Sequence, residues 1–176
     1  MTKIDTTRPP KLIALCGLEG AGKSETAKCL RVAYGYTIRS FAEPIKAYLS
    51  ALGVPHASLY GTPEQKAAPI PEFGGKSGRE LMVGLGEYTA RRPGPTVFAR
   101  ALMTDIADIQ DHAYPKLIVI DDLRFPDEFL AVRAAGGVVW CVTRGHYEMV
   151  RHSFVSVIVN DGDIPALHER VAALLR

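Results

Sequence analysis

The chain has 176 residues, of which 47% are hydrophobic and 23% charged, as is typical of a soluble globular protein large enough to bury a core. The formal net charge of +2 is too small to indicate a polymeric nucleic acid as partner. We expect no membrane partner and no signal peptide, because no apolar run has the length that either requires. The three cysteines form no paired or metal-binding motif, which favours buried thiols and a cytoplasmic location.

The most informative motif lies near the start of the chain. Residues 11–16 predict a buried strand, residues 22–34 predict a helix, and the segment between them has the spacing G-x-x-x-x-G-K-S. This pattern is typical of a phosphate-binding loop, in which glycines let successive backbone N–H groups point at an anion at the start of a helix. The residues expected to bind the phosphates are Gly17, Glu19, Gly20, Ala21, Gly22, Lys23, Ser24 and Glu25.

The rest of the chain alternates between helix and strand patterns. After an expected flexible arm at residues 1–10, we predict further strands at 36–39, 116–120, 138–142 and 154–159. Further helices are expected at 40–52, 77–92, 96–112, 125–135 and 163–175, the first with Ser40 and Glu43 as a capping box. The segment 53–76 is rich in Gly and Pro and predicts a surface excursion with one helical turn near 64–67.

This alternation predicts an α/β fold of three layers, with about five mainly parallel strands and helices on both faces. We expect a single domain over 11–176, with a ligand-binding insertion at about 41–95 and a short basic lid at about 144–153. Leu81, Met82, Leu85 and Tyr88 predict the inner stripe of the helix at 77–92. In such a fold, ligands bind beyond the carboxyl ends of the strands.

Two acidic residues follow the strand at 116–120. Ser24 and Asp121 are the expected Mg²⁺ ligands, because hydroxyl and carboxylate oxygens suit that ion. Asp122 is the alternative carboxylate, and a helix-capping role is the other interpretation of either. Arg124, in the same turn, would bind a phosphate or else form a surface ion pair with Asp127 or Glu128.

Other cations and one aromatic residue also lie where a ligand could reach them. Arg79 begins a predicted helix, and Arg91 ends it; each would bind an anion or be solvated surface charge. Arg144 and Arg151 lie in the basic connection before the last strand, where they would stabilise a transferring phosphoryl group or belong to an ordinary polar loop. Phe41 would contact a base or sugar, or pack in the core.

Several longer segments resemble a known family, the phage-type deoxynucleoside monophosphate kinases of the P-loop nucleoside monophosphate kinase group. The resemblance covers most of the chain from Lys11 onward. It rests on Phe41-Ala42-Glu43-Pro44-Ile45-Lys46, Arg79-Glu80-Leu81-Met82-Val83-Gly84-Leu85-Gly86, Asp122-Leu123-Arg124 with Asp127-Glu128, Gly136-Gly137-Val138-Val139 through Arg144, and Asn160-Asp161-Gly162.

The resemblance implies transfer of the ATP γ-phosphoryl group, with Mg²⁺, to a deoxynucleoside monophosphate such as dGMP, dTMP or a modified-base dNMP. It implies that Lys23, Arg124, Arg144 and Arg151 are catalytic, and it leaves a homodimer as an option. The implied dNMP-binding residues are Phe41, Lys46, Arg79, Arg91 and Arg124, and the implied adenine-binding residues are Arg144, Asn160, Asp161 and Gly162.

Two alternatives remain open from the sequence. The first is another small P-loop kinase, acting on dephospho-coenzyme A or a small metabolite. The second is a nucleotide-dependent switch protein with slow hydrolysis, although the chain has no obvious guanine-reading N-K-x-D motif. Base preference would lie in the insertion between Gly53 and Lys76, which the sequence alone leaves unassigned.

Overall fold

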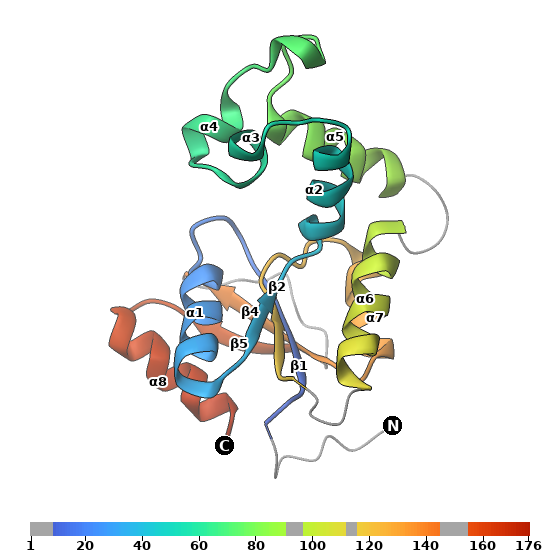
Figure 1. Cartoon of the computed structure of the whole chain (residues 1–176). Helices are drawn as coiled ribbons and strands as arrows, with labels where there is room; N and C mark the ends of the chain where they lie inside the picture. Colours follow the sequence, from blue (N-terminus) through green and yellow to red (C-terminus); the bar gives the residue numbers. More distant parts are fainter. Residues whose placement is uncertain (1–8, 91–96, 112–115, 145–154) are drawn as a thin grey trace. The chain divides into compact units, whose positions relative to one another are not determined.

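The structure, a computed structural model, describes residues 9–90, 97–111, 116–144 and 155–176. Most of the predicted arm and most of the predicted lid therefore lie outside the described residues. The chain forms two compact units, one made of Met1–Ser40 and Met103–Arg176 and the other of Phe41–Leu102 (Figure 1). The predicted insertion at 41–95 falls within the second unit, so it has a core of its own.

The first unit is built on a sheet whose strands, within the described residues, are all parallel and follow the order β2-β3-β1-β4-β5. Its central strands are apolar throughout because helices cover both faces of the sheet. The predicted α/β class with about five strands is confirmed. The strands are β1 (Leu12–Cys16), β2 (Thr37–Arg39), β3 (Ile118–Ile120), β4 (Val138–Thr143) and β5 (Val155–Val159).

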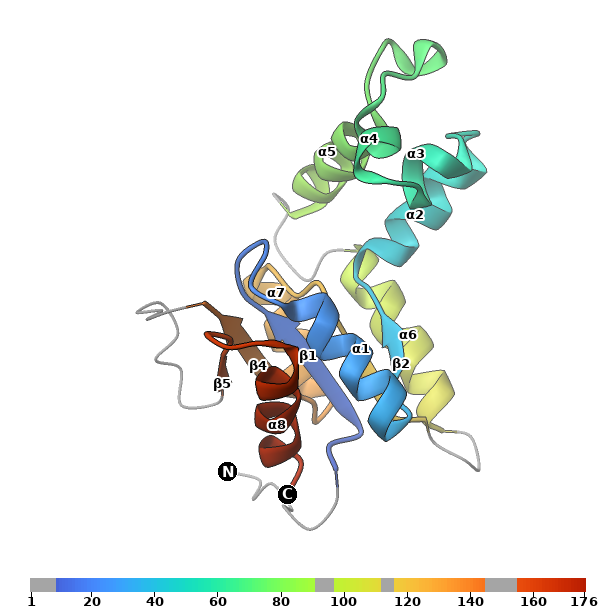
Figure 2. The ribbon, with the colours of Figure 1, turned by 90° about the vertical axis from the view of Figure 1, so that its left-hand side faces the viewer.

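Helices α1 (Lys23–Tyr34) and α8 (Ile164–Leu174) cover one face of this sheet, and α7 (Pro126–Ala134) covers the other (Figure 2). On the first face, Leu15 and Trp140 from the sheet pack with Leu30 and Leu167 from the helices. These side chains are at most 2% exposed. Burial at this level stabilises a fold by about 1.5–3 kcal/mol for each large apolar side chain.

The order of the strands determines where a ligand could bind. Strand β1 lies between β3 and β4. Strands β2 and β3 are therefore added to the sheet on one side of β1, and β4 and β5 on the other side. This is a topological switch point, and the segments that follow β1, β3 and β4 diverge there. Strand β1 is followed by the phosphate-binding loop, β3 by the Asp121–Arg124 turn and β4 by Arg144.

The second unit consists of short helices around a small apolar core of Leu49, Val54, Leu59 and Ile70. Leu81, Met82 and Leu85 pack against this core as predicted, whereas Tyr88 is 60% exposed, so its assignment to the inner stripe was wrong. Its elements are α2 (Ala42–Ala51), α3 (His56–Tyr60), α4 (Pro63–Ala67), the 3₁₀ helix η1 (Pro71–Phe73), α5 (Gly78–Ala90) and the first part of α6 (Val97–Gln110). The boundary between the two units in the sequence lies within α6, after Leu102.

The segment 53–76 is more ordered than the sequence predicted. The expected helical turn near 64–67 is α4, but α3 and η1 were not predicted. Proline begins or precedes each of these three elements, and a left-handed glycine at Gly74 ends η1. Prolines and glycines here mark the boundaries of short helices, which explains why their density resembled that of an irregular loop.

The capping of the two longer helices also differs from the prediction. Ser40 does not cap α2, whose N-cap residue is Phe41; instead its hydroxyl donates a 2.6 Å hydrogen bond to Asp122. A true capping box lies at α5, where the Glu80 backbone N–H donates to the Ser77 hydroxyl and the Ser77 N–H donates to the Glu80 carboxylate. No helix in the described part of the chain is long and apolar enough to span a membrane.

The cap at α5 gives a test of the second unit. Replacing Ser77 by Ala removes the acceptor for the Glu80 N–H, and we expect the free energy of unfolding to fall by about 1 kcal/mol. Chemical denaturation with helix content as the signal measures this change. The exposed Ser50, which lies within α2, is the matched control, and Ser50→Ala should leave stability nearly unchanged. Equal effects of the two substitutions would contradict the role given to the cap.

Candidate functional site

The loop between β1 and α1 has the backbone of an anion cradle. Gly17, Gly20 and Gly22 have φ values of 136°, 76° and 109°, which L side chains rarely adopt. A Cβ on Gly17 would lie 2.1 Å from the Val142 carbonyl oxygen, so this glycine is also needed for the close approach to β4. Gly22 is the N-cap of α1, and the helix presents its N-terminal N–H groups at the end of the loop.

Lys23 is held at the centre of this loop. Its ammonium donates hydrogen bonds of 2.7 Å and 2.8 Å to the carbonyl oxygens of Gly17 and Leu18, which hold the side chain folded back over the loop. Burial lowers the pKa of Lys23, and the positive charge of Arg124 lowers it further. The negative charges of Asp121 and Glu19 oppose both effects. An anion bound in the loop would relieve the repulsion between the two cations.

The turn after β3 therefore lies within electrostatic range of Lys23. Arg124 is exposed and follows the buried Leu123, whose N–H donates to the Leu15 carbonyl oxygen at the end of β1. This hydrogen bond ties the turn to the strand that enters the loop. The sequence-predicted residues Lys23, Asp121 and Arg124 are thus brought together at the switch point of the sheet.

The structure also separates the roles of the two adjacent aspartates. Asp122 accepts the hydrogen bond from Ser40, which follows β2, and so connects the ends of two neighbouring strands. Asp121 is the carboxylate that acts on Lys23. Its backbone N–H donates to the Arg39 carbonyl oxygen. This arrangement favours Asp121 over Asp122 as the carboxylate that would face a phosphate bound in the loop.

Glu128 fixes the backbone of the Asp121–Arg124 turn, a role that was not predicted from the sequence. Its carboxylate is 6% exposed and accepts hydrogen bonds from the backbone N–H groups of Arg124 and Phe125, at 2.8 Å and 3.0 Å. The predicted surface ion pair between Arg124 and Glu128 is therefore replaced by a contact to the Arg124 backbone. Burial raises the pKa of Glu128 from its ordinary value of 4.5 to about 7, although the two N–H donors lower it.

Asn160 supports the phosphate-binding loop through a hydrogen bond, although the sequence predicts a contact with the adenine. Its side chain is 7% exposed, and its amide donates a 2.8 Å hydrogen bond to the Ala21 carbonyl oxygen. A Cβ on Gly22 would lie 2.4 Å from the same amide nitrogen. The buried amide of Asn160 therefore supports the loop, and its predicted contact with the adenine stays a prediction.

The other residues predicted near the adenine are exposed. The Asp161 carboxylate forms an ion pair with Arg170 of α8, with 2.6 Å between Oδ1 and the guanidinium nitrogen. This contact lowers the pKa of the Asp161 carboxyl. Gly162 and Arg144 are exposed at the ends of β5 and β4. Arg151 and Arg91 lie outside the described residues. These positions stay predictions.

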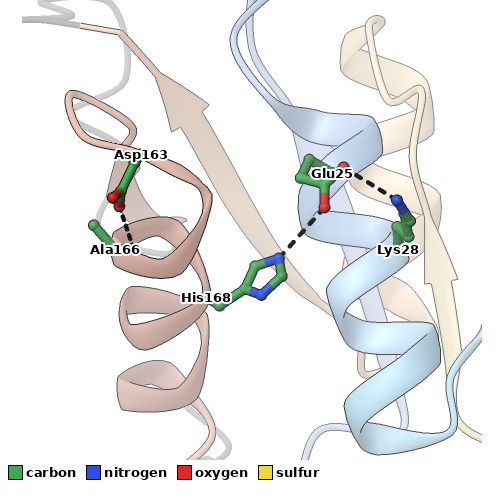
Figure 3. A network of polar contacts seen from close by, with 5 residues as sticks. All are labelled: Glu25, Lys28, Asp163, Ala166 and His168. Carbon is green, nitrogen blue, oxygen red and sulfur yellow. Dashed lines mark hydrogen bonds and ion pairs between the residues drawn. The ribbon is translucent and has the colours of Figure 1, made fainter.

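Glu25 points away from the loop and contacts α8 (Figure 3). One carboxylate oxygen lies 3.4 Å from His168 Nε2, and the other lies 3.8 Å from the Lys28 ammonium. No role is predicted for His168 from the sequence, because a linear sequence does not indicate that α1 and α8 are neighbours. The Glu25 side chain therefore joins two helices in this structure, and only its backbone remains a candidate for phosphate binding.

Three residues predicted to bind the dNMP belong to the second unit. Phe41 is 3% exposed, so a base could stack on its ring only if the ring became uncovered. The Lys46 ammonium lies 5.1 Å from the centre of the Tyr60 ring, in a cation–π contact. Arg79 is exposed in the first turn of α5. Each of these roles stays a prediction.

The residues at the loop suit a magnesium ion that arrives with a nucleotide. Ser24 is exposed in the first turn of α1, and Asp121 acts on the neighbouring Lys23. No group of three or more His, Cys, Asp or Glu residues among those that the structure describes could hold a metal by itself. One hydroxyl and one carboxylate match an ion that takes its other ligands from phosphates and water.

Comparison with known proteins gives similarities in sequence and in fold. No protein-family model matches the chain. A protein of Acanthamoeba polyphaga mimivirus, provisionally assigned as a deoxynucleotide monophosphate kinase, is 28% identical over 142 residues, which cover 76% of this chain and 74% of that protein.

Two solved structures share the fold. They are a mutant APS kinase of Mycobacterium tuberculosis (TM-score 0.51, 13% identity, covering 96% of this chain and 98% of that one) and a sugar kinase from Janibacter sp. HTCC2649 (TM-score 0.51, 14% identity, covering 95% of each). The chain thus has the fold of the P-loop kinases. The similarity in sequence to the mimivirus protein supports a kinase, that is, a phosphotransferase.

Glu128 gives a prediction about pH and stability. Because its folded pKa is raised, its contribution to stability is complete below about pH 4.5 and is lost as the pH rises through about 7. The free energy of unfolding, measured relative to Glu128→Gln, should therefore fall by up to about 3 kcal/mol between about pH 4.5 and pH 8. Urea titrations of both proteins across this range measure the difference.

Glu169→Gln, which changes an exposed carboxylate on α8, is the control and should keep the pH dependence of the wild type. If the wild type and Glu128→Gln differed by the same free energy at every pH, Glu128 would titrate like a solvated carboxylate and the assignment would be wrong.

Proposed function

We propose that this chain is a deoxynucleoside monophosphate kinase, which transfers the γ-phosphoryl group of ATP to a dNMP and releases ADP and a dNDP. The observation that carries the proposal is the convergence of Lys23, Asp121 and Arg124 on the glycine loop at the switch point of the sheet. The mimivirus relative supports a nucleotide as the acceptor. The proposal includes a cytoplasmic location, with no polymeric nucleic acid or membrane as partner.

On the donor side, the backbone N–H groups of the loop and of the first turn of α1 would bind the β- and γ-phosphates. Lys23 already lies over the loop, and phosphate oxygens would replace the Gly17 and Leu18 carbonyls as its acceptors. Ser24 and Asp121 would hold Mg²⁺, which when bound neutralises part of the phosphate charge. Arg144 and the Asn160–Gly162 segment remain the candidates for the adenine end.

On the acceptor side, Arg124 is the candidate ligand of the dNMP phosphate in the first unit, and Arg79 and Lys46 are the candidates in the second unit. A guanidinium suits this role because its planar set of donors matches two phosphate oxygens at once. The backbone of Arg124 is fixed by Glu128, so its side chain starts from a defined position. Arg91, Arg151 and Phe41 complete the set of candidates.

The chemistry needs orientation and positive charge rather than a general base. A nucleoside monophosphate is already ionised near neutral pH, so an oxygen of its phosphate can attack the γ-phosphorus in line without losing a proton first. Lys23 and Arg124 would stabilise the charge on the transferring group while keeping two anionic substrates together. Exclusion of water by Arg144 and Arg151 on closure would limit ATP hydrolysis.

A kinase acting on an acceptor other than a nucleoside monophosphate is the second candidate, because the fold is shared with an APS kinase and a sugar kinase. A coupled assay of ADP release can separate the candidates when it is run with deoxynucleoside and ribonucleoside monophosphates, dephospho-coenzyme A, adenosine phosphosulfate and sugars. A switch protein would instead hydrolyse ATP at a rate that no acceptor changes.

The donor site predicts the effect of removing Lys23. Lys23→Ala should lower kcat/KM for the preferred acceptor by about 10²- to 10³-fold, because a cation that stabilises the transition state is lost. Lys28→Ala is the matched control, since Lys28 is exposed on the same helix and its ammonium lies 3.8 Å from the Glu25 carboxylate. A wild-type rate in Lys23→Ala would overturn the proposed function.

The acceptor site predicts a selective change in KM. Arg79→Met should raise KM for the dNMP by about tenfold or more and leave KM for ATP nearly unchanged, because one charged hydrogen-bond donor to the acceptor is removed. Arg100→Met, at an exposed position of α6, is the control and should change neither constant. A rise in KM for ATP alone would place Arg79 on the donor side and contradict the assignment.

A further inference from the structure

Two of the three cysteines lie side by side at the edge of the sheet where the phosphate-binding loop begins. Cys16 is the last residue of β1, and it is in register with Cys141 of β4. Because paired residues of parallel neighbours point to the same face, both thiols lie on the face opposite to the core of Leu15 and Trp140. Both are free thiols in this structure.

The distance between the strands suits a bond between the two sulfur atoms. Neighbouring strands lie about 4.7–4.9 Å apart, within the range of about 4.4–6.8 Å between Cα atoms that a disulfide requires. Each thiol shifts the pKa of the other, so the two side chains lie within range of interaction. A disulfide would therefore need rotation of the side chains and only small movement of the backbone.

The surroundings of the pair also favour a reaction with an oxidant. Cys16 donates its S–H to Cys141, which lowers the pKa of the Cys141 thiol and raises that of Cys16, and the charge of Lys23 lowers both. The pair can thus lose one proton to leave a thiolate next to a thiol. Cys141 is 1% exposed, but Cys16 is partly exposed and gives a small oxidant a path to the pair.

We propose that Cys16 and Cys141 form a reversible oxidation site, which a small hydroperoxide converts into a disulfide between β1 and β4. The Cys141 thiolate attacks one oxygen of the peroxide, the O–O bond breaks, and a sulfenic acid forms with release of hydroxide or water. The Cys16 thiol then attacks that sulfur, and water leaves. In total two thiols and one hydrogen peroxide give one disulfide and two waters, so both sulfurs are oxidised and the peroxide is reduced.

The position of the bond connects it with the loop. Cys16 directly precedes Gly17, which packs against the carbonyl of Val142, the residue after Cys141. Even a small movement of the backbone on formation of the link would reach Gly17, where the close approach to Val142 leaves no room to adjust. The oxidised protein should therefore bind ATP less tightly, an effect that rests on the proposed function and should reverse when the disulfide is reduced.

The test is to treat the purified wild-type protein with hydrogen peroxide, digest it without reduction and identify the linked peptides by mass spectrometry. The expected product has lost two hydrogen atoms, contains a Cys16–Cys141 linkage, keeps Cys29 as a thiol and returns to its starting mass with dithiothreitol. Cys29, buried in α1 and 5% exposed, is the internal control for unfolding.

Retention of three thiols at peroxide doses that oxidise a control dithiol would overturn the proposal, as would a linkage that includes Cys29 or sulfinic acid at Cys16 without a disulfide. Cys16→Ser and Cys141→Ser should each lose the linkage, and Cys29→Ala should keep it. Binding of a fluorescent ATP analogue is measured before and after oxidation. If the reduced protein fails to bind it, the proposed function fails, and the mapped linkage alone decides the oxidation site.

Discussion

The candidate site depends on the place of β1 between β3 and β4. Parallel strands end at the same edge of the sheet, and the chain leaves these three strands in different directions. The glycine loop, the Asp121–Arg124 turn and Arg144 therefore emerge next to one another, although the loop is far from the other two in sequence. A different strand order with the same helices would separate the loop from Asp121, Arg124 and Arg144.

The loop itself is held by contacts that do not involve a ligand. Lys23 donates to two loop carbonyls, and the buried amide of Asn160 donates to a third, that of Ala21. These bonds keep the loop open in a conformation that only glycine adopts easily at three positions. Preorganisation of this kind lowers the entropic cost of binding a phosphate, since the donors need not be ordered at that moment.

The second support is the buried carboxylate of Glu128 under the Asp121–Arg124 turn. A carboxylate that accepts two backbone N–H groups at the start of a helix fixes the turn and also pairs donors that the helix itself leaves unpaired. Asp122 ties the same turn to the end of β2 through Ser40. Two of the acidic residues near the loop thus hold the scaffold, and Asp121 stays the carboxylate proposed to face a bound phosphate.

The sequence by itself determined the sheet, the helices around it and the loop, because buried parallel strands are apolar throughout and the G-x-x-x-x-G-K-S spacing has a direct backbone meaning. It also indicated Asp121 and Arg124 from their place after β3. Only the tertiary structure decided that Asn160 braces the loop, that Ser40 binds Asp122 and that Glu25 meets His168. Each of these contacts joins segments far apart in the chain, and local spacing carries no information about such partners. The cysteine pair is the same kind of result, since the register of β1 against β4 places Cys16 beside Cys141.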